Sequence, residues 1–271
     1  MTLTRRLPTS VRALVWTGAL LFWVVQLTLL LGAGLALPDT IVLAILLVAM
    51  PAFALAQLPL VADTPIERLP AYWGSLATLW LIGAACWLVG TRDAGPAAIG
   101  VVWPGAASLV SWSVGLTVAG LTMMLVFRWV TSVTGARESQ MLRELLPRSP
   151  QERGVFVLLS VAAGVGEEVA YRGYAIPLLA TIMGVPAAAV LTSVVFGILH
   201  GYQGLLGTVR TTLIGGTLAW GFLASGSLLP VIVAHTLIDL VAGLLLGDWL
   251  LPPEPVAREG YDLQSSETRE A

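Results

Sequence analysis

Charged residues are scarce in this sequence, and lysine is absent altogether. Only 11% of the 271 residues carry a charged side chain, against about 25% in soluble globular proteins. Hydrophobic residues make up 57% of the chain, and its mean hydropathy is +0.87. This composition excludes an ordinary soluble domain and indicates a polytopic membrane protein.

Cysteine is nearly absent too, and the single Cys86 excludes an intramolecular disulfide. The chain has neither a basic patch nor a nucleic-acid-binding motif, so we expect no nucleic acid as a partner. The apolar composition predicts the lipid bilayer as a partner instead. No internal repeat is visible, which removes one common sign of a transporter. Nothing in the sequence indicates an oligomeric state.

Continuously apolar runs of helix length fill most of the chain. They occupy residues 13–36, 40–61, 72–90, 108–130, 154–180, 186–202, 206–225 and 228–247. A helix satisfies its own backbone hydrogen bonds in lipid, whereas a barrel needs alternating strands of about ten residues, which this sequence lacks. We therefore predict an all-α fold, a polytopic membrane bundle of about eight transmembrane helices.

The polar connections predict the topology. Residues 131–153 form the longest polar connection and are rich in arginine, as is the N-terminus, so both are expected on the cytoplasmic side of the cell membrane. This connection also mixes charged and apolar residues, which fits either an interfacial helix or a solvated helical linker. An even number of spans puts the C-terminus on the cytoplasmic side as well, in a tail, residues 251–271, that we predict to be disordered.

Two adjacent carboxylates, Glu167 and Glu168, interrupt the fifth apolar run, and Arg172 follows closely. Ionisable side chains inside a bilayer cost at least about 2.5 kcal/mol each, so such a group is taken as a functional site. Because side chains at i and i+4 meet on a helix, Glu168 and Arg172 are predicted to form an ion pair that acts as a structural clamp. Glu167 is rotated about 100° away and is left free to bind a proton, a metal or a water, as a general base would.

The two histidines of the chain lie in later apolar runs. His200 ends one run, and His235 precedes Asp239 by one helical turn in the last. Asp239 can orient His235 by accepting its ring N–H or can bind a metal, while a helix-packing hydrogen bond is the structural alternative. With Glu167, these residues have the ligand chemistry of a zinc site beside a general base, in which His200, His235 and Asp239 are the predicted metal ligands.

Three motifs in this order resemble the CPBP family of intramembrane proteases, named for CAAX-prenyl proteases and bacteriocin-processing enzymes and also called Abi. They are Glu-Glu-x-x-x-Arg from Glu167, Phe-x-x-x-His ending at His200, and His-x-x-x-Asp from His235, where the family has Asn or Asp as the last residue. The resemblance covers about residues 150–247. It implies an endopeptidase acting on a membrane-associated peptide or protein, with residues 151–250 as the catalytic membrane core and residues 1–150 as an N-terminal four-helix region plus the cytoplasmic loop.

The resemblance also implies roles for the site residues. Glu167 with His200 would activate the hydrolytic water, His235 with Asp239 would stabilise the oxyanion, and Glu168 with Arg172 would hold the site's shape. An ionised Asp only accepts hydrogen bonds, so Asp239 would have to be protonated, bind metal or orient His235. Zn²⁺ and a metal-free glutamate mechanism both stay open.

Two other classes of protein fit the same residues. A proton- or cation-coupled transporter would use the buried Glu, His and Asp side chains as a relay. A non-catalytic immunity or scaffold membrane protein would keep them only as packing bonds. Further polar side chains that can line an opening beside the motifs are Tyr171, Tyr174, Tyr202, Gln203 and Arg210.

Overall fold

The computed structural model describes residues 8–61, 64–136 and 139–250, and over these ranges it is all-helical with no strand. The helices are α1 (Thr9–Leu27), α2 (Leu37–Ala44), α3 (Met50–Val61), α4 (Arg68–Gly90), α5 (Ala106–Thr134), α6 (Gln140–Glu144), α7 (Pro150–Glu168), α8 (Ile176–Met183), α9 (Val185–Leu199), α10 (Gly204–Ser225), α11 (Leu229–Leu240) and α12 (Gly247–Leu250). Turns of π-helix follow α1, α2, α7 and α11, at Thr28–Gly32, Ile45–Ala49, Val169–Ala175 and Val241–Leu245, and 3₁₀ turns lie at Pro96–Ile99 and Gly201–Gln203. The predicted all-α membrane bundle is confirmed.

The predicted count of eight transmembrane helices is not confirmed. By length and composition, five continuous helices in the described ranges can cross a membrane, and they are Thr9–Gly32, Leu37–Val61, Arg68–Gly90, Ala106–Thr134 and Pro150–Met183. The next two apolar runs form a pair of helices bent by 59° at His200, which makes a sixth span if the pair is one broken span. The last run, Leu229–Leu245, is an apolar helix shorter than those five.

Local sequence signals explain where α7 begins. The Ser149 side chain accepts a hydrogen bond from the Glu152 backbone N–H, and the Glu152 carboxylate accepts from the Ser149 N–H, which forms a capping box. Pro150 occupies the first turn, where its missing N–H costs nothing. These contacts fix the start of the helix that carries both motif glutamates.

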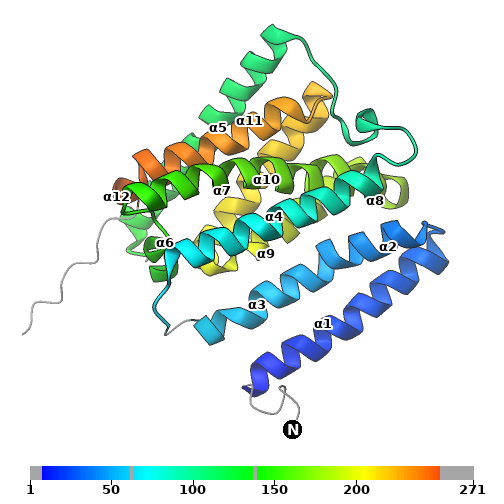
Figure 1. The fold of residues 1–271 in the computed structure, drawn as a ribbon, viewed down its shortest axis with the longest axis horizontal. Coiled ribbons are helices and arrows are strands. Elements are labelled where there is room, and N and C mark those ends of the chain that lie inside the picture. Colours follow the sequence, from blue (N-terminus) through cyan, green and yellow to red (C-terminus); the bar gives the residue numbers. More distant parts are fainter. Residues whose placement is uncertain (1–7, 62–63, 137–138, 251–271) are drawn as a thin grey trace, which may run out of the picture.

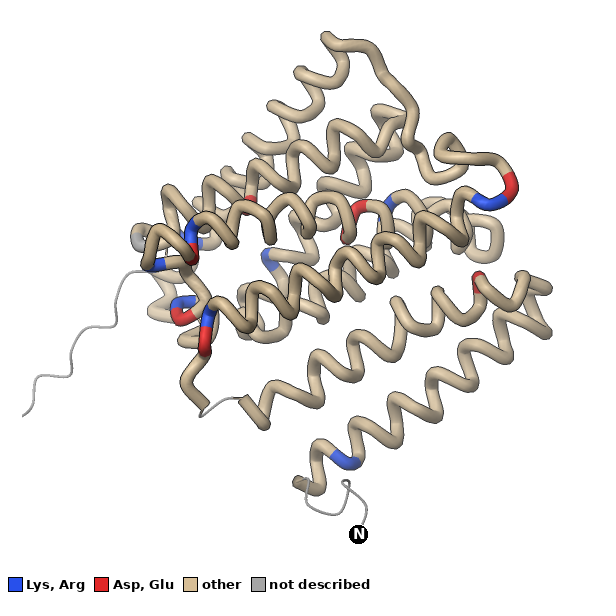
Figure 2. The backbone as a smooth tube through the Cα atoms, viewed as in Figure 1, with Lys and Arg blue, Asp and Glu red and all other residues tan. Residues whose placement is uncertain are grey.

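The helices that surround the motif residues form a continuous group. In it α4 packs on α7, α7 on α11, α11 on α5, and α10 on α9. Helix α1 with α2 and α3 makes a hairpin at one edge of the bundle, where α3 reaches α9 (Figure 1). Charged residues lie mainly near the helix ends, and only a few lie along the middle (Figure 2).

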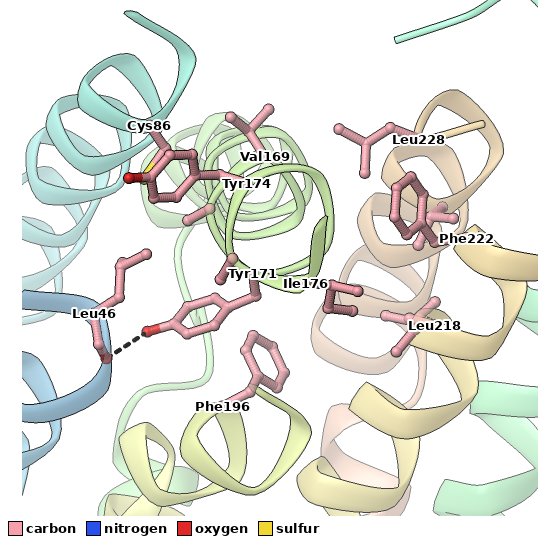
Figure 3. Packing of buried hydrophobic residues seen from close by; sticks show 14 of the residues in the cluster. Leu46, Cys86, Val169, Tyr171, Tyr174, Ile176, Phe196, Leu218, Phe222 and Leu228 are labelled. Carbon is pink, nitrogen blue, oxygen red and sulfur yellow. Dashed lines mark hydrogen bonds between the residues drawn. The ribbon is translucent and has the colours of Figure 1, made fainter. Parts of the chain in front are cut away.

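Every residue of the π-helical turn that follows α7 is buried in the core. The rings of Tyr171 and Phe196 meet edge to face at 5.7 Å, and the Tyr171 hydroxyl donates to the Leu46 carbonyl at 3.4 Å (Figure 3). On the same turn, Tyr174 donates to the Asp39 carboxylate at 3.0 Å. These hydrogen bonds join the first hairpin to the helices that carry the motifs.

The connection between α5 and α7 packs on the protein. Tyr72 on α4 donates to the Leu145 carbonyl at 2.5 Å, and Ser139 donates to the Tyr202 carbonyl at 2.7 Å. Among the residues of this connection that the structure describes, α6, five residues long, is the only helix. The first seven residues and the tail, residues 251–271, lie outside the described residues, so the predicted orientation of the termini and the predicted disorder of the tail stay predictions.

Candidate functional site

The two glutamates end α7 at a point where helices approach closely. A Cβ added to Gly166 would lie 2.5 Å from the Leu79 carbonyl oxygen, and one added to Gly83 would lie 2.9 Å from the Gly166 Cα, so α4 and α7 touch through their backbones. The chain then enters the π-helical turn Val169–Ala175. Single π turns inside helices are frequent at functional sites.

The predicted clamp between Glu168 and Arg172 is present and fully buried. Arg172 Nη1 donates to Glu168 Oε1 at 2.7 Å, and the two side chains are 1% and 0% exposed. Arg172 also donates from Nη2 to the Gly215 carbonyl at 3.0 Å, and its guanidinium carbon lies 4.5 Å from the centre of the Phe196 ring. The pair therefore joins α7, α9 and α10.

His235 is oriented by Glu168, and not by Asp239 as one sequence reading allowed. Its Nδ1 lies 2.7 Å from Glu168 Oε1. Because a carboxylate paired with Arg172 only accepts hydrogen bonds, Nδ1 donates to it. The other ring nitrogen, Nε2, faces Glu167 Oε2 at 3.6 Å and Asp239 Oδ2 at 3.7 Å. Both distances exceed a direct hydrogen bond and leave room for a bridging atom.

Glu167 lies apart from the Glu168–Arg172 ion pair, as its position on the helix predicts. Its Oε2 is buried and has no hydrogen-bond partner among the described residues, while the side chain as a whole is 18% exposed. Orphaned buried carboxylate oxygens are rare in folded proteins and call for a ligand or water. A small cavity borders the same side chain, between α3, α4, α7 and α9.

His200 lies at the bend between α9 and α10. Its Nδ1 donates to the Phe196 carbonyl at 2.8 Å, which leaves Nε2 available. The centre of the Phe196 ring lies 4.8 Å from that of the His200 imidazole and 6.0 Å from that of the His235 imidazole. The structure thus brings the three motifs together around Phe196.

The donor atoms do not form a ready metal site. Among the described residues, no group of three or more His, Cys, Asp or Glu side chains is placed so that it can hold a metal ion. The predicted ligands His200, His235 and Asp239 therefore do not make a ligand set here, and zinc stays a prediction.

Of the further polar candidates, Tyr171 borders the cavity beside Glu167, whereas Tyr174 bonds to Asp39 at the start of α2. Gln203 Oε1 accepts from Arg210 at 3.1 Å and from Thr211 at 3.2 Å. The sequence reading missed the Gly215 carbonyl as a partner of Arg172, because no local pattern marks it.

A family model matches the region that carries the three motifs. The model described as type II CAAX prenyl endopeptidase Rce1-like matches residues 150–241, from the start of α7 to the end of α11. Residues 150–241 are therefore similar to a Rce1-like domain, and we use that name for them. This is consistent with the CPBP family that the motifs resemble.

The Rce1-like domain contains all six predicted site residues. Its family supports intramembrane endopeptidase activity in general, and its apolar helices make the chain a multi-pass membrane protein. Neither the curated proteins nor the solved structures contain a match to this chain.

Proposed function

We propose that this protein is an intramembrane endopeptidase in which Glu167 activates a water molecule to hydrolyse a peptide bond of a membrane-associated protein or peptide. The observation that carries this proposal is the orphaned Oε2 of Glu167, 3.6 Å from an imidazole nitrogen that a buried ion pair holds in place. A water bound to both atoms would complete their hydrogen bonds. The carboxylate is then within reach of the proton that it has to remove.

Each step uses side chains of the Rce1-like domain. Glu167 takes a proton from the water, and the resulting hydroxide oxygen bonds to the peptide carbonyl carbon. The Nε2–H of His235 donates to the water before the attack and then to the oxyanion that forms beside it, since Nδ1 is already committed to Glu168. When the C–N bond breaks, Glu167 returns the proton to the leaving amine. His200, through its available Nε2, assists Glu167 in holding the water.

In this proposal Asp239 acts with His235 to stabilise the oxyanion. It is 34% exposed and lies one helical turn beyond His235. A protonated Asp239 can donate to the oxyanion, and an ionised one supports the positive charge on His235. Glu168 and Arg172 act as positioning residues. Because the donor atoms do not form a metal-ligand set, no step passes through a metal.

Peptide cleavage by the purified protein in detergent or nanodiscs tests the proposal. Glu167→Gln and His200→Ala should lower kcat by at least about a hundredfold, the size expected for the loss of general acid–base catalysis. Glu144→Gln is a matched control, because Glu144 lies on α6, outside residues 150–241, and bonds the exposed side chain of Gln140. Cleavage that survives both site substitutions would remove the mechanism. Inactivation by a chelator, reversed by Zn²⁺, would show that a metal takes part.

A further inference from the structure

The cavity beside Glu167 has walls that the proposed chemistry does not use. Its volume is about 30 Å³, and its lining includes Met50 on α3, Thr78, Leu79 and Ile82 on α4, and Leu199 on α9. A space of this size accommodates one or two waters or a small side chain. The nature of the walls decides between these occupants.

The walls favour an apolar occupant over water. A buried water needs two to four polar partners. Beside Glu167, the lining offers only two hydroxyls, those of Thr78 and Tyr171, whose protons are already donated, so both can only accept; the other lining residues are apolar. The Thr78 hydroxyl donates to the Gly74 carbonyl at 2.9 Å, and the Tyr171 hydroxyl donates to Leu46. The catalytic water is better placed on the other side of Glu167, where Nε2 of His235 offers a second polar partner.

The cavity also lies where a peptide can reach it. Helix α3 packs on α1 and α9, whereas α4 packs on α7. Thr78, in the wall formed by α4, is exposed. A chain entering between α3 and α4 would bring one side chain into the cavity while its backbone passes Glu167.

We propose that this cavity is a specificity subsite that takes a small apolar side chain, such as that of alanine or valine, next to the scissile bond, and that Met50 and Ile82 set its size limit. The inference rests on the proposed peptidase function and adds the substrate class. An apolar pocket of fixed size discriminates by tens to hundreds of fold for each misfitting group. Substrates with a bulky residue at this position are therefore cleaved more slowly.

A peptide series tests the size limit. Each peptide has an apolar Leu-Ala helical anchor followed by a short segment with one varied residue, Gly, Ala, Val, Leu or Phe, and mass spectrometry locates the cut. The wild type should cleave the Ala peptide at least about tenfold faster than the Phe peptide. Ile82→Ala and Met50→Ala should raise cleavage of the Phe peptide about tenfold and keep cleavage of the Ala peptide, which also shows that the variants fold.

Matched controls are available on the same helices. Leu81 on α4 and Phe53 on α3 are 70% and 68% exposed and do not line the cavity, so Leu81→Ala and Phe53→Ala should leave the preference unchanged. An unchanged preference in the two enlarged variants, or an equal shift in the controls, would overturn the subsite.

Disulfide trapping separates this proposal from the hydrolytic mechanism. In a Glu167→Gln background, a peptide with cysteine at the varied position should cross-link under mild oxidation to Ile82→Cys and not to Leu81→Cys. Protein without an introduced cysteine serves as the blank, because Cys86 is buried. Cross-linking at position 82 without hydrolysis by the wild type would keep the subsite and reject the peptidase. Glu167-dependent hydrolysis with equal cross-linking at positions 81 and 82 would keep the peptidase and reject the subsite.

Discussion

Arg172→Ala should destabilise the protein far more than the loss of an ordinary arginine. The substitution leaves the Glu168 carboxylate, which is 0% exposed, without its cation, and it removes the donor to the Gly215 carbonyl and the contact with the Phe196 ring. Removing one partner of a fully buried ion pair costs about 3–5 kcal/mol. His235 still bonds Glu168, so the lower half of that range is expected.

Thermal unfolding of purified protein in detergent measures the effect. A loss of about 3 kcal/mol corresponds to a fall in Tm on the order of 10 °C for a folded unit of this size. The control is Arg128→Ala, because Arg128 makes an exposed bond to the Trp249 carbonyl and a contact with the Trp249 ring, away from the buried trio. Such surface contacts contribute about 1 kcal/mol or less.

Three results are informative. The double variant Arg172→Met with Glu168→Gln should recover part of the lost Tm, because neither buried charge remains. Wild-type Tm in Arg172→Ala would refute the clamp. Wild-type Tm with abolished cleavage would give Arg172 a direct role in the chemistry.

Two further substitutions test how α7 is placed. Gly166→Ala should lower the free energy of unfolding by about 1–3 kcal/mol and reduce cleavage, since its Cβ would press on the Leu79 carbonyl. In the control Gly74→Ala, the added Cβ meets no atom within 4 Å, so this variant should be neutral. Tm and kcat of both variants measure these effects. Ser149→Ala should lower the free energy of unfolding by about 1 kcal/mol through loss of the capping box with Glu152, and equal Tm for wild type and variant would contradict it.

The sequence predicted the parts of the site that depend on one helix. The Glu168–Arg172 pair follows from their i, i+4 spacing, and the isolation of Glu167 follows from its rotation away from that pair. The bond between His235 and Glu168 joins residues 67 positions apart, and no local pattern encodes it. Asp239 follows His235 at the same i, i+4 spacing at which Arg172 follows Glu168. Its Oδ2, however, lies 3.7 Å from Nε2 of His235, which is too far for a direct hydrogen bond.

The number of membrane spans could not be predicted from the sequence, for a different reason. Hydropathy records how long an apolar run is, but not whether two neighbouring runs lie on one axis. The runs on either side of His200 look like two independent spans, yet the helices they form meet at 59° around a 3₁₀ turn. That bend places His200 at the end of α9.

One oxygen of Glu168 accepts hydrogen bonds from both Arg172 and His235. The ion pair and the imidazole are therefore thermodynamically coupled, and energies measured by substituting them one at a time will not add. A change at any of the three positions alters the background in which the other two are judged. A substitution of Glu168, Arg172 or His235 that the fold tolerates should therefore be accompanied by a change at one of the other two positions. These three residues act energetically as one unit of the site.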